Sequence, residues 1–167
     1  MKLEEKIKLI GHLSIYKIYG RDPEFQTREL VFSEENLLTL LTKQQILSYI
    51  YSAVTTDPVN GIKVGTGGCI DPDGLFPKQE DQNWTSLNNT ITSIGVSGLL
   101  SVGQAVDNTI PQVTFLADID QSTANGNSIN EAGLFKVSGD MFNVKTFPSI
   151  PKTAEFSLHF EWVIKLA

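Results

Sequence analysis

The final segment of the chain carries a strict alternation of apolar and polar side chains. The apolar residues fall at every second position and comprise Phe156, Leu158, Phe160, Trp162, Ile164 and Leu166. Polar residues lie between them, with Val163 as the single exception. Because successive side chains of a β-strand point to opposite faces, this period of two predicts a strand with one buried face.

Further β-prone segments precede this strand. We expect them at about residues 7–19, 27–32, 37–41, 62–64, 89–96, 113–119, 134–137 and 141–147. One helix is predicted from Thr42 to about Val54, because Thr42-Lys43-Gln44-Gln45 has the form of a capping box and apolar residues follow at helical spacing. The pattern as a whole predicts a mainly β protein, an antiparallel β-sandwich with one short α-helix.

The composition fits a single domain that spans residues 1–167. Hydrophobic residues make up 41% of the chain and charged residues 19%, a balance typical of folded proteins. The net charge of −6 argues against non-specific nucleic-acid binding, which needs clustered lysine and arginine. Apolar runs are far shorter than the about 20 residues that cross a membrane, and no signal peptide is visible. We therefore expect protein partners, with neither nucleic acid nor membrane among them.

A polar insertion at residues 67–86 interrupts the strands. Its prolines and acidic residues disfavour regular strands, yet it carries Leu75, Phe76 and Trp84, which gain little by staying in water. We interpret these three residues as a candidate assembly loop that a neighbouring subunit buries. Because ordering costs ~1–2 kcal/mol per residue, the loop is expected to stay mobile until that contact forms. For Trp84 a second interpretation stays open, namely that it anchors the loop to the core of its own domain.

Short motifs in the first half of the chain have simpler interpretations than a ligand site. Gly65-Thr66-Gly67-Gly68 lacks the lysine of a phosphate-binding loop and is predicted to be a turn after a short strand. Asp71-Pro72-Asp73-Gly74, with Glu80 beyond it, resembles part of a calcium loop, but the glycine comes too early and no helices flank it. A β-turn is favoured. Cys69, the sole cysteine, excludes an intrachain disulfide and has no local sign of activation.

The titratable residues of the second half give no catalytic pattern. Asp118 and Asp120 share a strand face and are candidates for a ligand pair or an acid–base pair, with a solvated strand end as the simpler interpretation. His12 and His159 are the only histidines, and His159 lies on the polar face of the last strand. Gly95-Val96-Ser97-Gly98 has the wrong spacing for a nucleophile elbow. We therefore predict no catalytic, cofactor-binding or metal-binding residues, and a protein that is not an enzyme.

Several short segments occur in an order that resembles a known family. They are NLLTLLTKQ at 36–44, KVGTG at 63–67, INEAGLF at 129–135, TFP at 146–148 and WVI at 162–164. From about residue 9 to 166 the chain is similar to a family of small structural proteins of tailed-bacteriophage virions, often labelled tail-fibre-like. It departs from the family at Thr42, where a glycine is usual, and in its longer insertion at 67–86.

The resemblance implies a structural component of a tailed-phage virion, in the tail, baseplate or fibre-attachment region. Such a protein is made in the host cytoplasm and assembles with other virion proteins and with copies of itself as a homo-oligomer. No catalytic residues carry over, and Glu131 and Gly133 are expected at a turn or at the entry to a strand. The alternative hypothesis is a carbohydrate-binding module that touches the host surface. A cell-wall hydrolase is disfavoured because an acid–base constellation is missing.

Overall fold

The structure is a computed structural model that describes residues 9–40, 42, 57–95 and 112–166. Within these ranges the chain forms eight β-strands and a short 3-10 helix, η1. The elements are β1 (Leu9–Tyr19), η1 (Pro23–Phe25), β2 (Thr27–Leu38), β3 (Val59–Gly65), β4 (Thr90–Gly95), β5 (Gln112–Ile119), β6 (Ser128–Lys136), β7 (Met141–Pro151) and β8 (Phe156–Leu166). The mainly β class predicted from the sequence is confirmed.

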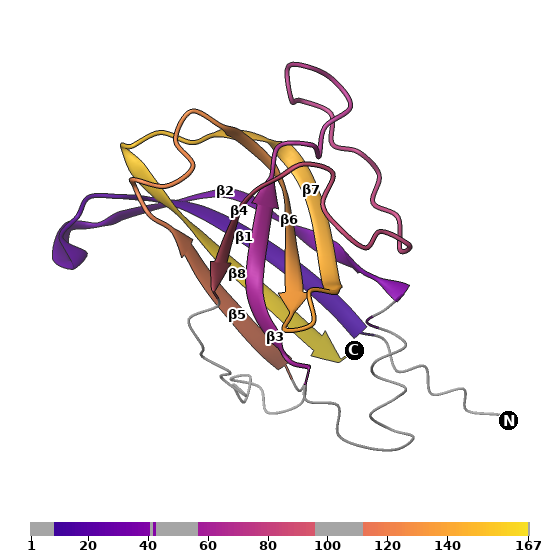
Figure 1. Ribbon diagram of the computed structural model, residues 1–167. Helices are drawn as coiled ribbons and strands as arrows, with labels where there is room; N and C mark the ends of the chain where they lie inside the picture. The colour runs from indigo at the N-terminus through magenta and orange to yellow at the C-terminus, as the bar shows by residue number, and fades with distance from the viewer. Residues whose placement is uncertain (1–8, 41, 43–56, 96–111, 167) are drawn as a thin grey trace, which may run out of the picture.

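The described strands form one antiparallel sheet in the order β4-β3-β6-β7-β2-β1-β8-β5. The sheet curls until its edge strands, β4 and β5, approach each other (Figure 1). The fold is therefore a nearly closed barrel, and one continuous sheet takes the place of the expected sandwich. The reason lies in β2, which pairs with β1 from Thr27 to Asn36 and then with β7 at Leu37 and Leu38. This strand joins what would otherwise be two separate sheets.

Two strands predicted separately from the sequence are joined in the structure. The strands expected at 27–32 and 37–41 are largely one strand, β2, since the polar residues Ser33, Glu34 and Glu35 stay in extended backbone on an exposed part of the sheet. The helix expected from Thr42 falls almost entirely on residues 43–56, which lie outside the described residues. That helix stays a prediction.

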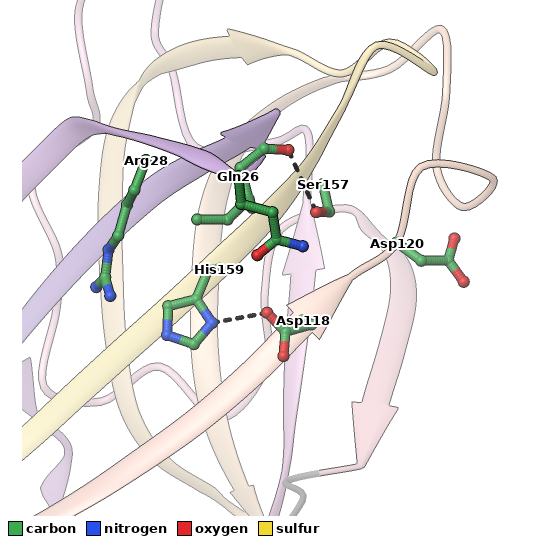
Figure 2. Close-up of a pocket in the computed structure, with 7 residues that line it drawn as sticks. Gln26, Arg28, Asp118, Asp120, Ser157 and His159 are labelled. Atoms are coloured by element: carbon green, nitrogen blue, oxygen red, sulfur yellow. Dashed lines mark hydrogen bonds and ion pairs between the residues drawn. The ribbon is translucent and has the colours of Figure 1, made fainter. Parts of the chain in front are cut away.

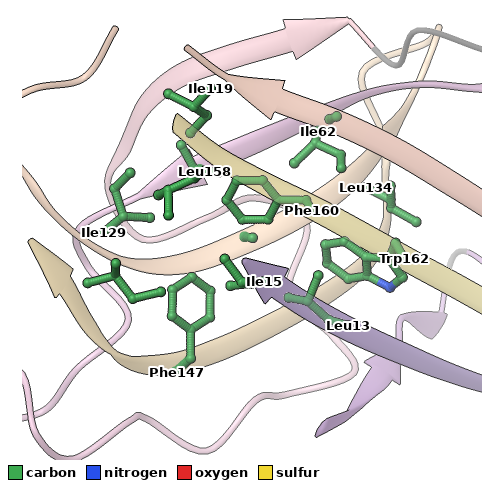
Figure 3. Close-up of a cluster of buried hydrophobic side chains, with 14 of the residues drawn as sticks. Leu13, Ile15, Ile62, Ile119, Ile129, Leu134, Phe147, Leu158, Phe160 and Trp162 are labelled. Atoms are coloured by element: carbon green, nitrogen blue, oxygen red, sulfur yellow. The ribbon is translucent and has the colours of Figure 1, made fainter. Parts of the chain in front are cut away.

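The alternating face of β8 forms the centre of the core. Strand β1 pairs with one edge of β8 and β5 pairs with the other, so strands enclose the inward side chains of β8. The buried cluster, much of it visible in Figure 3, includes Leu13, Ile15, Ile62, Ile129, Leu134, Phe147, Leu158, Phe160 and Trp162. The sequence prediction of one buried face is confirmed from Phe156 to Ile164.

Trp162 is the largest fully buried side chain, and its polar group is satisfied inside the core. The side-chain oxygen of Asn36 accepts hydrogen bonds from Trp162 Nε1 and from Asn143 Nδ2, while its nitrogen donates to the carbonyl of Gly11. A side chain at Gly11 would collide with this amide. Strands β1, β2, β7 and β8 therefore meet at one buried polar contact.

We predict that Trp162→Ala lowers the free energy of unfolding by about 3–5 kcal/mol, because it leaves a cavity and removes the indole from its amide partner. Urea titration of wild type and variant measures the loss. The matched control is Phe25→Ala in the exposed turn after β1, which should change stability by less than about 0.5 kcal/mol. A loss below about 1 kcal/mol for Trp162→Ala would show that this face of β8 is not the core.

Candidate functional site

A single buried carboxylate holds the base of the 67–86 loop. Glu131 lies in β6 and has 0% of its surface exposed. Its Oε1 accepts from the backbone N–H groups of Gly67 (3.0 Å) and Asn89 (2.7 Å). Its Oε2 accepts from the backbone N–H (2.9 Å) and the Nδ2 (3.0 Å) of Asn88. Four charge-assisted hydrogen bonds offset the cost of burying the charge, and they tie both ends of the loop to one residue.

The glycines before the loop are required by this packing. A Cβ at Gly65 would collide with the carbonyl of Asn89, and one at Gly68 with the carbonyl of Asn130. Residues 65–68 form a tight connection after β3, in agreement with the turn predicted from the sequence. Glu131 was expected at a turn or at the entry to a strand, but it lies inside β6. A buried carboxylate is possible there because backbone N–H groups of the loop donate hydrogen bonds to it.

Residues 69–78, in the first half of the loop, fold into a small hairpin. Cys69 and Pro77 form an isolated bridge, and the N–H of Ile70 donates to the carbonyl of Phe76 (2.9 Å). The carboxylate of Asp71 closes the turn by accepting from the N–H groups of Leu75 (3.0 Å) and Phe76 (2.7 Å). These backbone hydrogen bonds, that from Leu75 first, lower the pKa of Asp71. The Asp-Pro-Asp-Gly segment is therefore a turn whose first carboxylate is occupied by its own backbone.

The loop is also bound along β7. The N–H of Ser149 donates to the carbonyl of Gly74 (2.7 Å), and Thr146 Oγ1 donates to the carbonyl of Lys78 (2.6 Å). The N–H of Thr146 donates to Glu80 Oε1 (2.9 Å). In this structure of one chain the loop is folded onto the domain; the mobility expected of the free loop stays a prediction.

The hairpin presents an exposed apolar surface. Ile70, Leu75 and Phe76, which we name the apolar tip, have 73%, 63% and 65% of their surfaces exposed. Figure 1 shows that this loop stands beyond the end of the sheet. Trp84 instead packs on a buried cluster that includes Leu87, Phe135, Met141 and Val144. Of the three residues proposed from the sequence, Leu75 and Phe76 are available to a partner, while Trp84 anchors the loop.

A shallow polar pocket on the outer face of the barrel is a second candidate site (Figure 2). Its volume is about 560 Å³, and it is lined by Ile18, Gln26, Arg28, Asp118, Asp120, Ser157 and His159. The strand register places Asp118 opposite His159, and Asp118 Oδ1 lies 2.6 Å from His159 Nδ1. This hydrogen bond raises the pKa of His159 against the opposing effect of its burial. Two residues singled out from the sequence thus meet as a cross-strand pair.

The pocket does not assemble a nucleophile and a base. His159 Nε2 lies 3.5 Å from Glu161 Oε1, so both ring nitrogens face carboxylates. Ser157 Oγ donates to the carbonyl of Ile18 (3.4 Å) and has no hydrogen bond to His159. In Figure 2 the Asp120 carboxylate points away from Asp118 and His159, and hydrogen bonds led by the Ser122 hydroxyl lower its pKa to about 2. Asp118 and Asp120 therefore do not act as a pair.

The remaining candidate nucleophile and histidine have structural partners. Cys69 Sγ donates to the carbonyl of Phe147 (3.5 Å), and burial raises the pKa of the thiol, which keeps it in the unreactive protonated form. His12 Nε2 lies 2.8 Å from Ser33 Oγ. Of Gly95-Val96-Ser97-Gly98, the last three residues lie outside the described part of the chain.

The part of the chain that the structure describes offers neither a cluster of metal ligands nor a membrane-spanning helix. No group of three or more histidine, cysteine, aspartate or glutamate side chains is arranged to hold a metal ion in that part of the chain. No helix within the same ranges has the length and apolar character of a membrane span. Comparison with protein-family models, with curated proteins and with solved structures gives no significant match.

We predict that Glu131→Gln lowers the free energy of unfolding by about 1–3 kcal/mol, because an NH₂ donor then faces N–H donors inside the protein. The loop should open locally as well, so amides of residues 67–89 should exchange faster with deuterium in mass-spectrometric measurements. Glu35→Gln, on the exposed stretch of β2, is the matched control. Unchanged loop protection in Glu131→Gln would mean that other contacts hold the loop.

Protonation of His159 should stabilise the fold. Because the folded-state pKa is raised above the ordinary value, its contribution is fully present below the unfolded pKa of about 6.5 and is lost as pH rises through the folded pKa. We expect the stability difference between wild type and His159→Asn to shrink from about pH 5 to about pH 9 in urea titrations. Asp118→Asn should flatten the same dependence. Parallel curves for wild type and His159→Asn would contradict this assignment.

Proposed function

We propose that this protein is a non-enzymatic structural component of a tailed-phage virion, placed in the tail, baseplate or fibre-attachment region. It acts by assembly with other virion proteins, and the apolar tip is its contact. The observation that carries the proposal is the exposure of Ile70, Leu75 and Phe76 on a hairpin that its own hydrogen bonds hold in place.

The apolar tip has the properties of a protein-binding element. Large exposed apolar side chains that lie together mark interaction surfaces, and an aromatic residue at their centre is a common anchor. Asp71 and Asp73 lie in the turn that joins Ile70 to Leu75, so charged residues accompany the apolar ones in this hairpin. Because the hairpin is already ordered, binding costs little conformational entropy, and more of the burial energy is left for affinity.

The segments that carry the resemblance also support the proposal. KVGTG and INEAGLF meet where Glu131 binds the backbone of Gly67. The first asparagine of NLLTLLTKQ, Asn36, meets the tryptophan of WVI, Trp162. Motifs distant in the sequence thus form two of the buried polar contacts among the described residues, which is expected if the motifs belong to a shared fold.

Assembly with identical copies needs two surfaces on each subunit when the contacts are head-to-tail. The apolar tip is one, and the end of the β1–β2 hairpin, with Phe25 and Leu30 exposed, is the candidate for the second. A closed ring of such contacts suits a virion component. The protein is accordingly placed in the virion after synthesis in the host cytoplasm.

Carbohydrate binding, the alternative function, has less support. A glycan site needs aromatic faces and amides on an open surface. The Tyr16 ring beside the polar pocket is covered by the Arg28 guanidinium, whose central carbon lies 3.6 Å from the ring centroid. Trp84 packs on the core. A glycan array probed with the isolated protein distinguishes the two functions, since an assembly protein should bind none of its sugars.

We predict that the double variant Leu75→Ser/Phe76→Ser folds normally but is not incorporated into phage particles. Both side chains are exposed, so the free energy of unfolding should change by less than about 0.5 kcal/mol. Quantitative mass spectrometry of purified particles measures incorporation, and urea titration of the isolated variant confirms its fold.

The matched control for this experiment is Val137→Ser. Val137 is 59% exposed in the turn between β6 and β7, so it tests the loss of an exposed apolar side chain away from the tip. This variant should be incorporated like wild type. Incorporation of the double variant at the wild-type level would refute the tip as the assembly contact.

A further inference from the structure

Lys152, directly after β7, is a buried amine whose hydrogen-bond partners are neutral. It is 1% exposed, and its Nζ donates to Asn125 Oδ1 (2.9 Å) and to the carbonyl of Thr153 (2.7 Å). Lys136, also buried, lies within 3.3 Å of two carboxylates, those of Asp57 and Asp140. Among the ion pairs of the described residues, none includes Lys152.

Burial makes the amine of Lys152 easier to deprotonate than that of an exposed lysine. Burial lowers the pKa of Lys152, while the charge of Asp120 acts in the opposite direction. The Phe156 ring centroid lies 5.5 Å from Nζ, and the ring face, like Asp120, stabilises the protonated form. A desolvated lysine loses its proton more readily than an exposed one, and the neutral amine is a nucleophile.

The carboxamide beside it is held in place. Asn125 Nδ2 donates to the carbonyl of Gln121 (2.8 Å), which leaves Oδ1 directed at the amine. The two backbones are joined as well, since the N–H of Gly126 donates to the carbonyl of Lys152 (2.9 Å) and the N–H of Lys152 donates to the carbonyl of Asn127 (2.9 Å). Amine and carboxamide are therefore kept adjacent, which raises their effective concentration.

The backbone before Asn125 is strained. Ala124 has a φ of 60°, the only positive φ of a non-glycine residue within the described ranges. Such a conformation costs of order 1–3 kcal/mol and persists where its surroundings enforce it, often at reactive or binding sites. Here it turns the chain so that Asn125 reaches Lys152.

We propose that Lys152 and Asn125 form an intramolecular isopeptide cross-link. The lone pair of Nζ attacks Asn125 Cγ, the new Nζ–Cγ bond forms, and the Cγ–Nδ2 bond breaks. One proton of the attacking amine ends on the departing nitrogen, so ammonia leaves, and no oxidant or other reactant is consumed. Because Asn125 is exposed, the ammonia has a direct path to solvent.

The cross-link would join the β5–β6 connection to the β7–β8 connection. It closes a covalent loop between residues 125 and 152, which restricts the unfolded chain and should raise the melting temperature. The proposal does not rest on the virion assignment, since it concerns only the chemistry of these two side chains.

Intact-mass spectrometry of the purified full-length protein tests the cross-link. The wild type should weigh less than its sequence mass by one ammonia, and peptide mapping should recover a branched peptide that joins Asn125 to Lys152. Lys152→Arg and Asn125→Ala should both restore the full sequence mass. A wild-type protein of full sequence mass that yields no branched peptide would overturn the proposal and leave Lys152 as a structural amine.

A succinimide at Asn125-Gly126 also loses ammonia and has to be distinguished. It forms through the Gly126 nitrogen, whose N–H is engaged with the carbonyl of Lys152. It does not need the lysine, so a mass deficit that persists in Lys152→Arg would refute the cross-link. Should that variant fail to fold, the branched peptide of the wild type decides the question alone.

Discussion

The structure depends on the burial of one ionised side chain, Glu131, inside a barrel strand. A carboxylate without exposure to water is tolerable only when hydrogen-bond donors surround it, and here the donors belong to the chain on both sides of a long loop. The loop can supply them only by approaching closely, which requires glycine at Gly65 and Gly68. The need to surround the Glu131 carboxylate with hydrogen-bond donors thus fixes the local sequence, the closure of the loop and the direction in which the loop leaves the sheet.

The same closure accounts for the proposed function. With both ends held and β7 bound along one side, the loop presents Leu75 and Phe76 on a firm support instead of a tether. Trp84 packs against the buried cluster of Leu87, Phe135, Met141 and Val144 and so supports the loop, which makes Trp84 unavailable to a partner. The polar pocket on the barrel wall differs in kind, because Arg28 and His159 are already engaged with carboxylates and Ser157 has no hydrogen bond to the imidazole of His159.

Sequence patterns predicted what depends on local alternation and missed what depends on distant partners. The inward face of β8 followed from residue type, and Leu75 and Phe76 could be singled out because they are apolar residues in a polar segment. The first half of β6 was missed because buried polar residues such as Glu131 look like a turn until their donors are known. The single sheet could not be predicted because the sharing of β2 between β1 and β7 leaves no mark in the composition of that strand. Ile70 was not assigned to the tip, although a β-turn was predicted directly after it, because the pairing of Ile70 with Phe76 across that turn could not be foreseen. Lys152 was overlooked because its burial is set by the fold.

The central claim is that the apolar tip is the surface by which this protein joins a virion. A cryo-electron microscopy map of the assembled particle, at a resolution that shows side chains, tests it most directly. If the apolar tip is the assembly contact, the map will show the chain in the tail, baseplate or fibre-attachment region, with Leu75 and Phe76 inserted into a neighbouring protein. A map in which the chain is present but these two side chains face solvent would contradict the claim, and so would a particle that lacks the chain.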